Sequence, residues 1–300
     1  MSWLLVTISV YFLLAIVALV DKYLLGGGLL SPKMYAFYVG ILGILALILI
    51  PFGFFIPQFL VMVLALLAGI FHILGVFITF KAIQIFEVSR VIPAIGGFLP
   101  LFVFGLTFIS PGEKEIISFF EIIAFSLLVL GSVIIAWEKS KTISFSSLRM
   151  AALAAFLFAL YFIFAKFVYQ DHPFISGFIW TRIGAFLMAM IFLFTKEVRQ
   201  ELLKKRETLK IKTFGILIPN QTMAAGAFLL QNWAVSMVPL GFLAFINALE
   251  GTRYIFLLIF AILLSIKFPK ILKEEISKSV LLQKILAILL ICGGLALLVL

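Results

Sequence analysis

The sequence contains few of the residues that enzymes use for chemistry. It has one cysteine, Cys292, and its two histidines, His72 and His172, lie far apart in the chain. A disulfide within the chain is therefore excluded, and no group of cysteines, histidines and carboxylates has the spacing of a metal site. The chain also lacks a GxxxxGK[ST] loop for ATP. We expect no metal, no cofactor and no enzymatic activity.

Charged residues are also scarce. Only 12% of the chain is charged and 65% is hydrophobic, with a mean hydropathy of +1.29, whereas a soluble domain is about half apolar and about a quarter charged. The net charge is +10, but the basic residues lie between apolar runs, so nucleic acid is not an expected partner. The sequence predicts an all-α integral membrane protein surrounded by membrane lipids.

Apolar runs of about 20 residues, the length that crosses a bilayer, recur along the chain. The first has no basic residues before it and no cleavage site after it, so we predict a retained span and not a signal peptide. We predict ten transmembrane helices, over 3–24, 34–50, a run ending near 82, 88–108, a run ending near 137, 148–169, 173–195, 213–237, 240–266 and 281–300.

The two halves of the chain resemble each other. AIVALVDK at 15–22 aligns with ALYFIFAK at 159–166, and IIAFSLLVLG, ending at Gly131, aligns with ILAILLICGG, ending at Gly294. We therefore predict a first five-helix repeat over 1–137, a linker over 138–147 and a second repeat over 148–300. Because five is odd, the second repeat enters from the opposite side, as in the inverted repeats of many secondary transporters.

Basic residues in the loops are distributed unequally. One set of loops and span ends holds 19 lysines and arginines, and the other set holds only Lys114 and Lys166. Since basic loops stay in the cytoplasm, we predict both termini outside an inner (plasma) membrane. Of the basic loops, 196–212 contains seven such residues and is either a basic helix on the membrane surface or a solvated linker.

The ten spans, the inverted repeat and the segment 82–113 resemble the drug/metabolite transporter superfamily, EamA-like branch. The matching residues are Ala82, Ser89, Pro100 and the pair Gly112-Glu113. This resemblance implies a solute exporter or exchanger with a central cavity lined by the third, fourth, eighth and ninth spans. Many bacterial members are thought to keep both termini in the cytoplasm, which differs from the orientation predicted by the loop charges.

The segment 245–254, FINALEGTRY, is the first candidate site. Asn247, Glu250 and Arg253 are spaced three residues apart within an apolar run, so one helix would carry them as a polar stripe. Charges inside a membrane are costly unless they face protein or water. Glu250 either contacts the substrate, with possible exchange of a proton, or forms a structural pair with Arg253.

Further polar residues occur inside predicted spans. Arg182 is too deep to reach either membrane surface easily; it has either a structural role or one of two functional roles, binding an anionic group or pairing with Glu250. His72 is either a structural residue or a ligand-binding or proton-sensing group, and Gln221 and Gln231 either join helices or line the cavity. Aromatic candidates for the cavity wall include Tyr161, Trp180, Tyr11 and Tyr254.

The fourth span contains Pro93, Gly96, Gly97 and Pro100. Such residues weaken the backbone hydrogen-bond ladder, which indicates either a hinge that lets the halves rock or close helix packing through glycine. We expect a secondary transporter that exports small polar metabolites such as amino acids, as a monomer or homodimer. The main alternative is a flippase for a lipid or a lipid-linked sugar phosphate, with Arg182 or Lys166 taking the phosphate.

Overall fold

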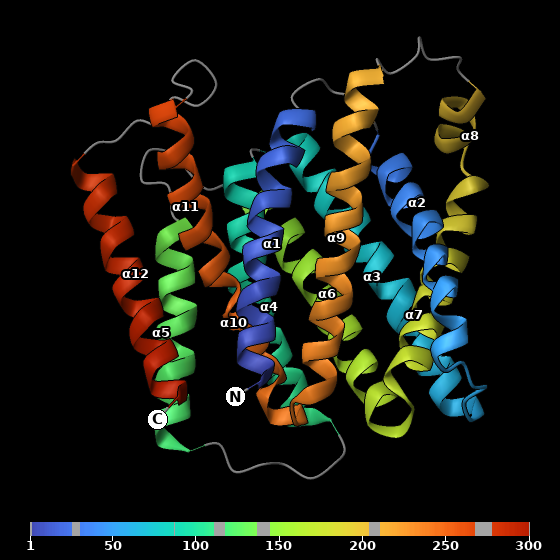
Figure 1. Ribbon diagram of the computed structural model, residues 1–300, viewed down its shortest axis with the longest axis horizontal. Coiled ribbons are helices and arrows are strands. Elements are labelled where there is room, and N and C mark those ends of the chain that lie inside the picture. Colours follow the sequence, from blue (N-terminus) through green and yellow to red (C-terminus); the bar gives the residue numbers. More distant parts are fainter. Residues whose placement is uncertain are drawn as a thin grey trace.

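Helices make up every secondary-structure element that the computed structural model describes (Figure 1). The described residues are 2–25, 31–86, 88–110, 118–136, 145–203, 211–267 and 278–299. The elements are α1 (Ser2–Leu25), α2 (Pro32–Gly43), η1 (Ile44–Phe52), α3 (Phe59–Ile85), α4 (Val88–Ile109), α5 (Phe119–Ala136), α6 (Phe145–Asp171), α7 (Phe174–Leu193), α8 (Lys196–Leu203), α9 (Ile211–Met237), η2 (Leu240–Phe242), α10 (Leu243–Ala248), α11 (Glu250–Lys267) and α12 (Lys278–Val299).

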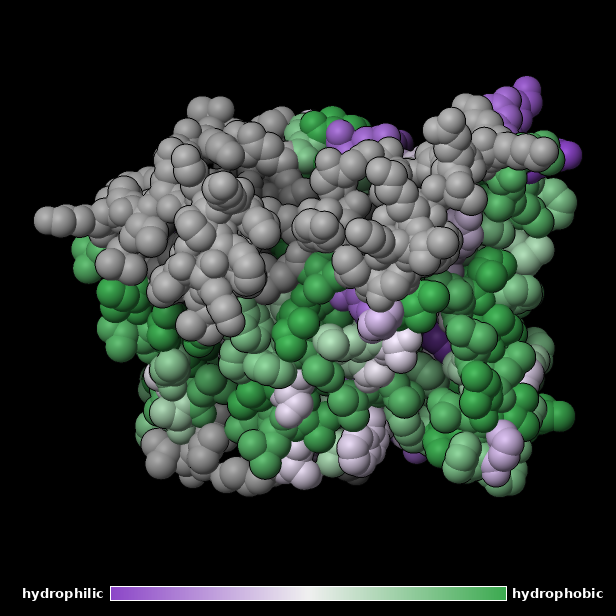
Figure 2. All heavy atoms as spheres, turned by 45° about the horizontal axis from the view of Figure 1, so that its top comes forward, coloured by the Kyte–Doolittle hydropathy of each residue, from purple (hydrophilic) through white to green (hydrophobic). Residues whose placement is uncertain are grey.

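The described chain is all-helical, and its long apolar helices are compatible with a membrane protein. Five segments are long and apolar enough to cross a bilayer: Pro32–Phe52, Phe59–Ile85, Phe145–Asp171, Phe174–Leu193 and Leu240–Leu257. Shorter apolar segments occur in α1, α4, α5 and α12. Large hydrophobic side chains cover much of the outer wall (Figure 2), as expected of a surface that faces lipid.

The predicted span 34–50 lies within one apolar segment, Pro32–Phe52, that is long enough to cross a bilayer, but its helix changes type. Ser31 starts α2 by accepting a hydrogen bond from the backbone N–H of Met34 at 3.3 Å, and Pro32 occupies the first turn, where its missing N–H costs nothing. From Ile44 to Phe52 the chain continues as a tighter 3₁₀-helix that contains Pro51. Proline cannot donate a backbone hydrogen bond, which favours this change.

The prediction of one continuous helix over 240–266 is wrong. A short 3₁₀-turn, η2, leads into α10, and Leu249 separates α10 from α11. At the junction the backbone N–H of Thr252 bonds to the carbonyl of Leu249 at 2.9 Å, and the Thr252 hydroxyl donates to the same carbonyl at 2.7 Å. Such local bonds compete with the regular ladder of an α-helix. Asn247 therefore lies on α10, and Glu250 begins α11.

The helices form one bundle. The N- and C-terminal ends of the described chain lie on the same side of this bundle, and α8 lies on the opposite side (Figure 1). In this view α5 and α12 form one edge, and α2, α7 and α8 lie at the other (Figure 1). Between them α1 packs along α9, while α6 packs against α3 and α4. The buried residues of these central helices form the main hydrophobic core.

Two glycines bring α3 and α7 into backbone contact. A Cβ atom on Gly69 would lie 2.1 Å from the carbonyl oxygen of Thr181, and one on Gly184 would lie 2.2 Å from that of Leu66. Only glycine leaves room for this crossing, a common device in membrane helices. The crossing brings His72, one turn after Gly69, to the level of Arg182, which follows Thr181.

Several predicted features lie outside the described residues. These are the Gly112-Glu113 pair, most of the linker 138–147, residues 204–210 of the basic loop, and residues 268–277 before the last helix. The beginning of the basic loop is described: it forms α8, where Val198 is buried and Glu197 makes an ion pair with Lys33 of α2. The first part of the segment 196–212 is therefore helical over Lys196–Leu203, where Lys196 and Arg199 alternate with Glu197 and Glu201.

Candidate functional site

Glu250 and Arg253 form an ion pair inside the bundle. The Nη1 atom of Arg253 lies 3.4 Å from Oε1 of Glu250, and the two side chains are 21% and 15% exposed, respectively. Their i, i+3 spacing on α11 brings the groups together, as the sequence predicts. We call Glu250, Arg253, Tyr254, Tyr11 and Gln231 the Glu250 cluster.

A glycine of α4 makes room for this cluster. A Cβ atom on Gly96 would lie 2.8 Å from the Tyr254 hydroxyl and 3.4 Å from Oε2 of Glu250. The neighbouring Gly97 faces Val133 of α5, where a Cβ atom would lie 2.9 Å from Cγ2 of that valine. Both glycines thus permit close packing around α4. Close packing through glycine was one of the two interpretations of these residues, and a hinge was the other.

Residues from both predicted halves of the chain enclose the pair. Tyr11 of α1 is buried, donates a hydrogen bond to the carbonyl of Ile246 at 2.9 Å, and hydrogen-bonds to Gln231 of α9. It also lies close enough to Glu250 and Arg253 to interact with them electrostatically. The ion pair therefore lies between α1 and α4 of the first half and α9 and α11 of the second.

Asn247 lies on the short helix before the ion pair. It is fully buried on α10, where its Nδ2 donates to the carbonyl of Leu243 at 2.9 Å. Its Oδ1 atom is buried without a hydrogen-bond partner. Asn247 thus lies on α10, while Glu250 and Arg253 lie on α11.

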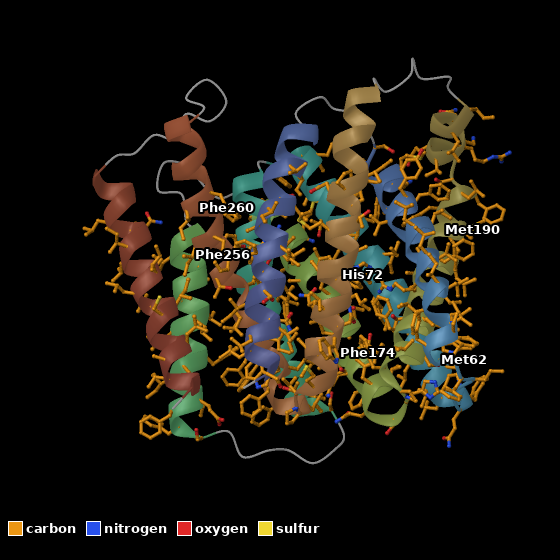
Figure 3. The ribbon with its side chains drawn as sticks, in the orientation of Figure 1. Met62, His72, Phe174, Met190, Phe256 and Phe260 are labelled. Carbon is orange, nitrogen blue, oxygen red and sulfur yellow. The ribbon has the colours of Figure 1, made fainter. Side chains whose placement is uncertain are left out.

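A second group of polar residues surrounds Arg182 of α7, which is only 5% exposed. Its guanidinium carbon lies 4.4 Å from the ring centre of Phe228 and 5.5 Å from that of Phe178. The His72 ring lies 4.8 Å from the Phe228 ring and 5.1 Å from the Tyr161 ring. Figure 3 shows His72 near the middle of the bundle, between its two ends. We call Arg182, His72, Tyr161, Tyr169, Phe178, Phe228 and Asn232 the Arg182 cluster.

Asn232 of α9 organises the hydroxyl groups of this cluster. Its Oδ1 accepts hydrogen bonds from Tyr161 at 2.5 Å and from Tyr169 at 2.8 Å, and its Nδ2 donates to the carbonyl of Phe228 at 2.9 Å. All three side chains are buried. The amide of Asn232 therefore joins α6 to α9, and both phenols use their protons within the protein.

Arg182 and Glu250 do not pair with each other, contrary to one of the two predicted roles of Arg182. The partner of Glu250 is Arg253, while Nε and Nη2 of Arg182 are buried without hydrogen-bond partners. The two clusters meet at α9, because Gln231 belongs to one and Asn232 to the other. Consecutive residues point about 100° apart around a helix, so α9 contributes to both clusters.

Other predicted residues lie elsewhere. Trp180 stacks on Phe54 and donates to the carbonyl of Phe55 at 3.1 Å, so it holds the segment after η1 and belongs to neither cluster. Gln221 is half-buried on α9, about three turns before Gln231. Pro93 and Pro100 lie within α4, which remains helical throughout. Lys166 donates to the carbonyl of Ser236 near the end of α9, at 3.2 Å.

Several members of the Arg182 cluster could not be singled out from the sequence. Asn232 stood out only as an amide within an apolar run. Phe178 and Phe228 are two of 35 phenylalanines, and Tyr169 lies at the predicted end of its span, where tyrosine is common. Only their shared contacts with Arg182 and Asn232 distinguish them.

Sequence comparisons identify no family. No family model matches the chain, and no curated protein matches it. Among solved structures, one described only as a crystal structure of a protein superimposes with a TM-score of 0.69 at 15% identity, covering 99% of this chain and 97% of that one. At this level of identity the match shows a shared fold and carries no information on activity.

Proposed function

We propose that this protein is a secondary transporter of the drug/metabolite type that exports small polar metabolites such as amino acids. Two inverted five-helix repeats cross the inner membrane and rock about a central site. The site contains Glu250 and Arg253, with Tyr11, Gln231 and Tyr254 around them. The Arg182 cluster forms its second part, on the neighbouring face of α9.

The observation that carries the proposal is an ion pair enclosed by both halves of the bundle. A purely structural pair would have little reason to sit where α1, α4, α9 and α11 meet, because charges taken out of water cost more than apolar packing of similar volume. A transporter requires polar groups at this place, since its substrate binds near the midplane where the repeats meet. Relative movement of the halves would change the surroundings of Glu250.

The repeat is supported by reciprocal contacts between α5 and α12. A Cβ atom on Gly131 would lie 3.0 Å from the carbonyl of Ala287, and one on Gly294 would lie 2.9 Å from that of Ala124. In the alignment of the two halves Gly131 matches Gly294, and Ala124 matches Ala287. The contact of Gly131 with Ala287 is therefore repeated, with the two halves exchanged, by the contact of Gly294 with Ala124. A two-fold relation between the repeats requires such a pair of contacts.

Other helix pairs support the same relation. α1 packs on α9 as its counterpart α6 packs on α3, and α4 packs on α6 as α11 packs on α1. The proposed orientation is supported by α8 and its basic residues, which lie at the end of the bundle opposite the two described chain ends (Figure 1). That end would face the cytoplasm, with both termini outside.

Solute exchange in proteoliposomes tests the proposal. Purified protein would be reconstituted into vesicles preloaded with unlabelled amino acids or other polar metabolites, and uptake of the same labelled solutes would be measured by counterflow. We expect at least one solute to exchange, and we expect Glu250→Gln to abolish or uncouple that exchange. Imposing a pH gradient on the same vesicles would show whether protons are coupled to transport.

Glu197→Gln is the matched control, because it removes the same charge from a side chain that is 63% exposed at the end of the bundle. It should exchange solutes at the wild-type rate. If folded wild-type protein exchanges none of the solutes, the transporter proposal fails. If Glu250→Gln exchanges them at the wild-type rate, the Glu250 cluster is not part of the site.

A flippase remains the second candidate because one observation favours it. α3 packs tightly on α7, but their counterparts in the repeat, α9 and α2, scarcely touch. Figure 2 shows hydrophilic residues within a recess of the hydrophobic wall, in the region that α9 and α2 flank in Figure 1. An opening toward the lipid is what a lipid headgroup would need to reach the interior of the bundle.

A further inference from the structure

Arg182 is a buried charge that pairs with no acidic side chain among those that the structure describes. Glu250 pairs with Arg253, and Glu197 pairs with Lys33. The other acidic side chains that the structure describes lie at helix ends: Glu121 accepts from the backbone N–H of Ser118 before α5, and Asp171 ends α6 in an exposed position. Among the described side chains, none offers Arg182 a carboxylate.

The surroundings of Arg182 offset only part of the cost of its burial. Its contacts with Phe228 and Phe178 are cation–π interactions, each of which stabilises by about 0.5–2 kcal/mol. An unpaired charge in a low-dielectric interior costs several kcal/mol. Nε and Nη2 also remain without acceptors. An anionic ligand would supply both the missing charge and the missing acceptors.

The nearby polar groups fit an anion better than a cation. Nδ1 of His72 is buried without a partner and can donate a hydrogen bond when it carries the ring proton. Tyr161 and Tyr169 donate their hydroxyl protons to Asn232, and neither accepts a hydrogen bond from Nε or Nη2 of Arg182, which are buried without partners. Arginine also binds carboxylates and phosphates through two parallel hydrogen bonds.

We infer that Arg182 binds a carboxylate or phosphate group of the transported molecule, with His72 as a second donor and Phe228 covering the guanidinium. This inference rests on the proposed transport function and restricts the substrate class to anions and to zwitterions such as amino acids. A free metabolite and a lipid headgroup can supply the same chemistry. The recess between α2 and α9 would serve the second source.

Thermal unfolding of the full-length protein in detergent tests the inference. The unfolding midpoint would be measured with increasing inorganic phosphate or succinate against sodium chloride of equal ionic strength, because a ligand that binds only the folded state raises the midpoint. In a parallel experiment, nanodiscs of phosphatidylcholine would be compared with nanodiscs that contain phosphatidylglycerol. A shift with the soluble anions indicates a free metabolite, and a shift only with phosphatidylglycerol indicates a lipid headgroup.

Arg182→Gln should weaken the binding of the effective anion by about 10- to 100-fold, the loss expected for hydrogen bonds to a charged group. Arg149→Gln is the matched control because it removes an arginine that is exposed near the start of α6; its response should equal that of the wild type. If Arg182→Gln responds as the wild type does, or if no anion shifts the wild-type midpoint, the inference is overturned.

A second variant keeps the test decisive if Arg182→Gln does not fold. His72→Glu would place a carboxylate beside Arg182, against the same Phe228 ring. We expect a higher unfolding midpoint and loss of the response to anions, because the guanidinium would be occupied from within the protein. An anion response as strong as in the wild type would count against Arg182 as the binding group.

The outcomes separate this inference from the proposed function. Anion binding that requires Arg182, without exchange of any solute, would reject the transporter and retain the anion site. Exchange of a solute that lacks an anionic group, at an equal rate in Arg182→Gln and the wild type, would reject the anion site and retain the transporter.

Discussion

The Glu250 cluster and the Arg182 cluster each enclose an arginine among helices, but the two arginines have different partners. Arg253 has a carboxylate one turn away on its own helix, 3.4 Å distant. Arg182 has aromatic rings and no acceptor at Nε or Nη2. A charge that is paired within one helix needs no partner from a neighbouring helix. A charge without a partner depends on neighbouring helices, and we attribute its retention to a ligand.

Disrupting the helix crossing beneath Arg182 should have the largest effect. A Cβ atom at Gly184 would lie 2.2 Å from the carbonyl of Leu66, so Gly184→Ala must push α3 and α7 apart. We expect a loss of at least about 3 kcal/mol of unfolding free energy, since such overpacking of backbone against backbone cannot relax by rotamer changes. The unfolding midpoint in detergent measures it.

Gly226→Ala on α9 is the control, because a Cβ atom there would have no neighbour within 4 Å. It should leave the midpoint unchanged or raise it, since alanine favours helix over glycine by about 1 kcal/mol. Equal midpoints for Gly184→Ala and the wild type would mean that the close crossing does not determine where Arg182 lies.

Removing the carboxylate of Glu250 would make the two clusters alike. Glu250→Gln leaves Arg253 without its partner, and we expect a loss of about 2 kcal/mol of stability, the contribution of a hydrogen bond between charged groups. Arg182→Gln should not destabilise the protein and should stabilise it by about 1 kcal/mol, because it removes an unpaired buried charge. Chemical or thermal unfolding of both variants at the same pH would show whether the first loses stability and the second gains it. A loss of stability in both would show that Arg182 has a partner within the protein.

The phenols of the Arg182 cluster should contribute moderately. Tyr169→Phe removes one of the two hydrogen bonds to Oδ1 of Asn232, and we expect a loss of about 1 kcal/mol. The double substitution of Tyr161 and Tyr169 by Phe should cost more than the sum of the two single changes, because Oδ1 then loses both acceptor interactions. Tyr38→Phe, at an exposed position on α2, is the control. Additive losses would mean that the two bonds act independently.

The ion pair between Lys33 and Glu197 should contribute least. The Glu197 side chain is 63% exposed, and exposed pairs contribute at most about 1 kcal/mol. We expect Glu197→Gln to change the unfolding free energy by less than about 0.5 kcal/mol. A loss as large as that of Glu250→Gln would show that the attachment of α8 to α2 stabilises the bundle as much as the buried pair does.

Several aspects of the fold could be predicted because they depend on local patterns. Runs of apolar residues predicted helices, and the predicted starts at 173 and 240 lie within one residue of the helix starts at Phe174 and Leu240. The interruption at Leu249 could not be predicted, because no proline occurs there. It depends on local hydrogen bonds of Thr252 and Asn247 that compete with the ladder of a helix.

The candidate site divides in the same way. The proximity of Glu250 to Arg253 follows from their spacing on a helix. The choice between the two roles of Arg182 does not, because both depend on which helices meet at α7. Tyr11 and Gln231, which are separated by most of the chain, could be joined only by the packing of α1 on α9.

The sequence by itself determined the environment of this protein and the cost of its charges. Long apolar runs require lipid, and lipid requires helices with satisfied backbones. Only the tertiary structure decided which charges are paired. The glycines at 69 and 184 bring α3 against α7 and so place His72 and Arg182 together, whereas no carboxylate reaches Arg182 among the described side chains. Partners across helices depend on the packing of whole surfaces, and no pattern within a single helix specifies that packing.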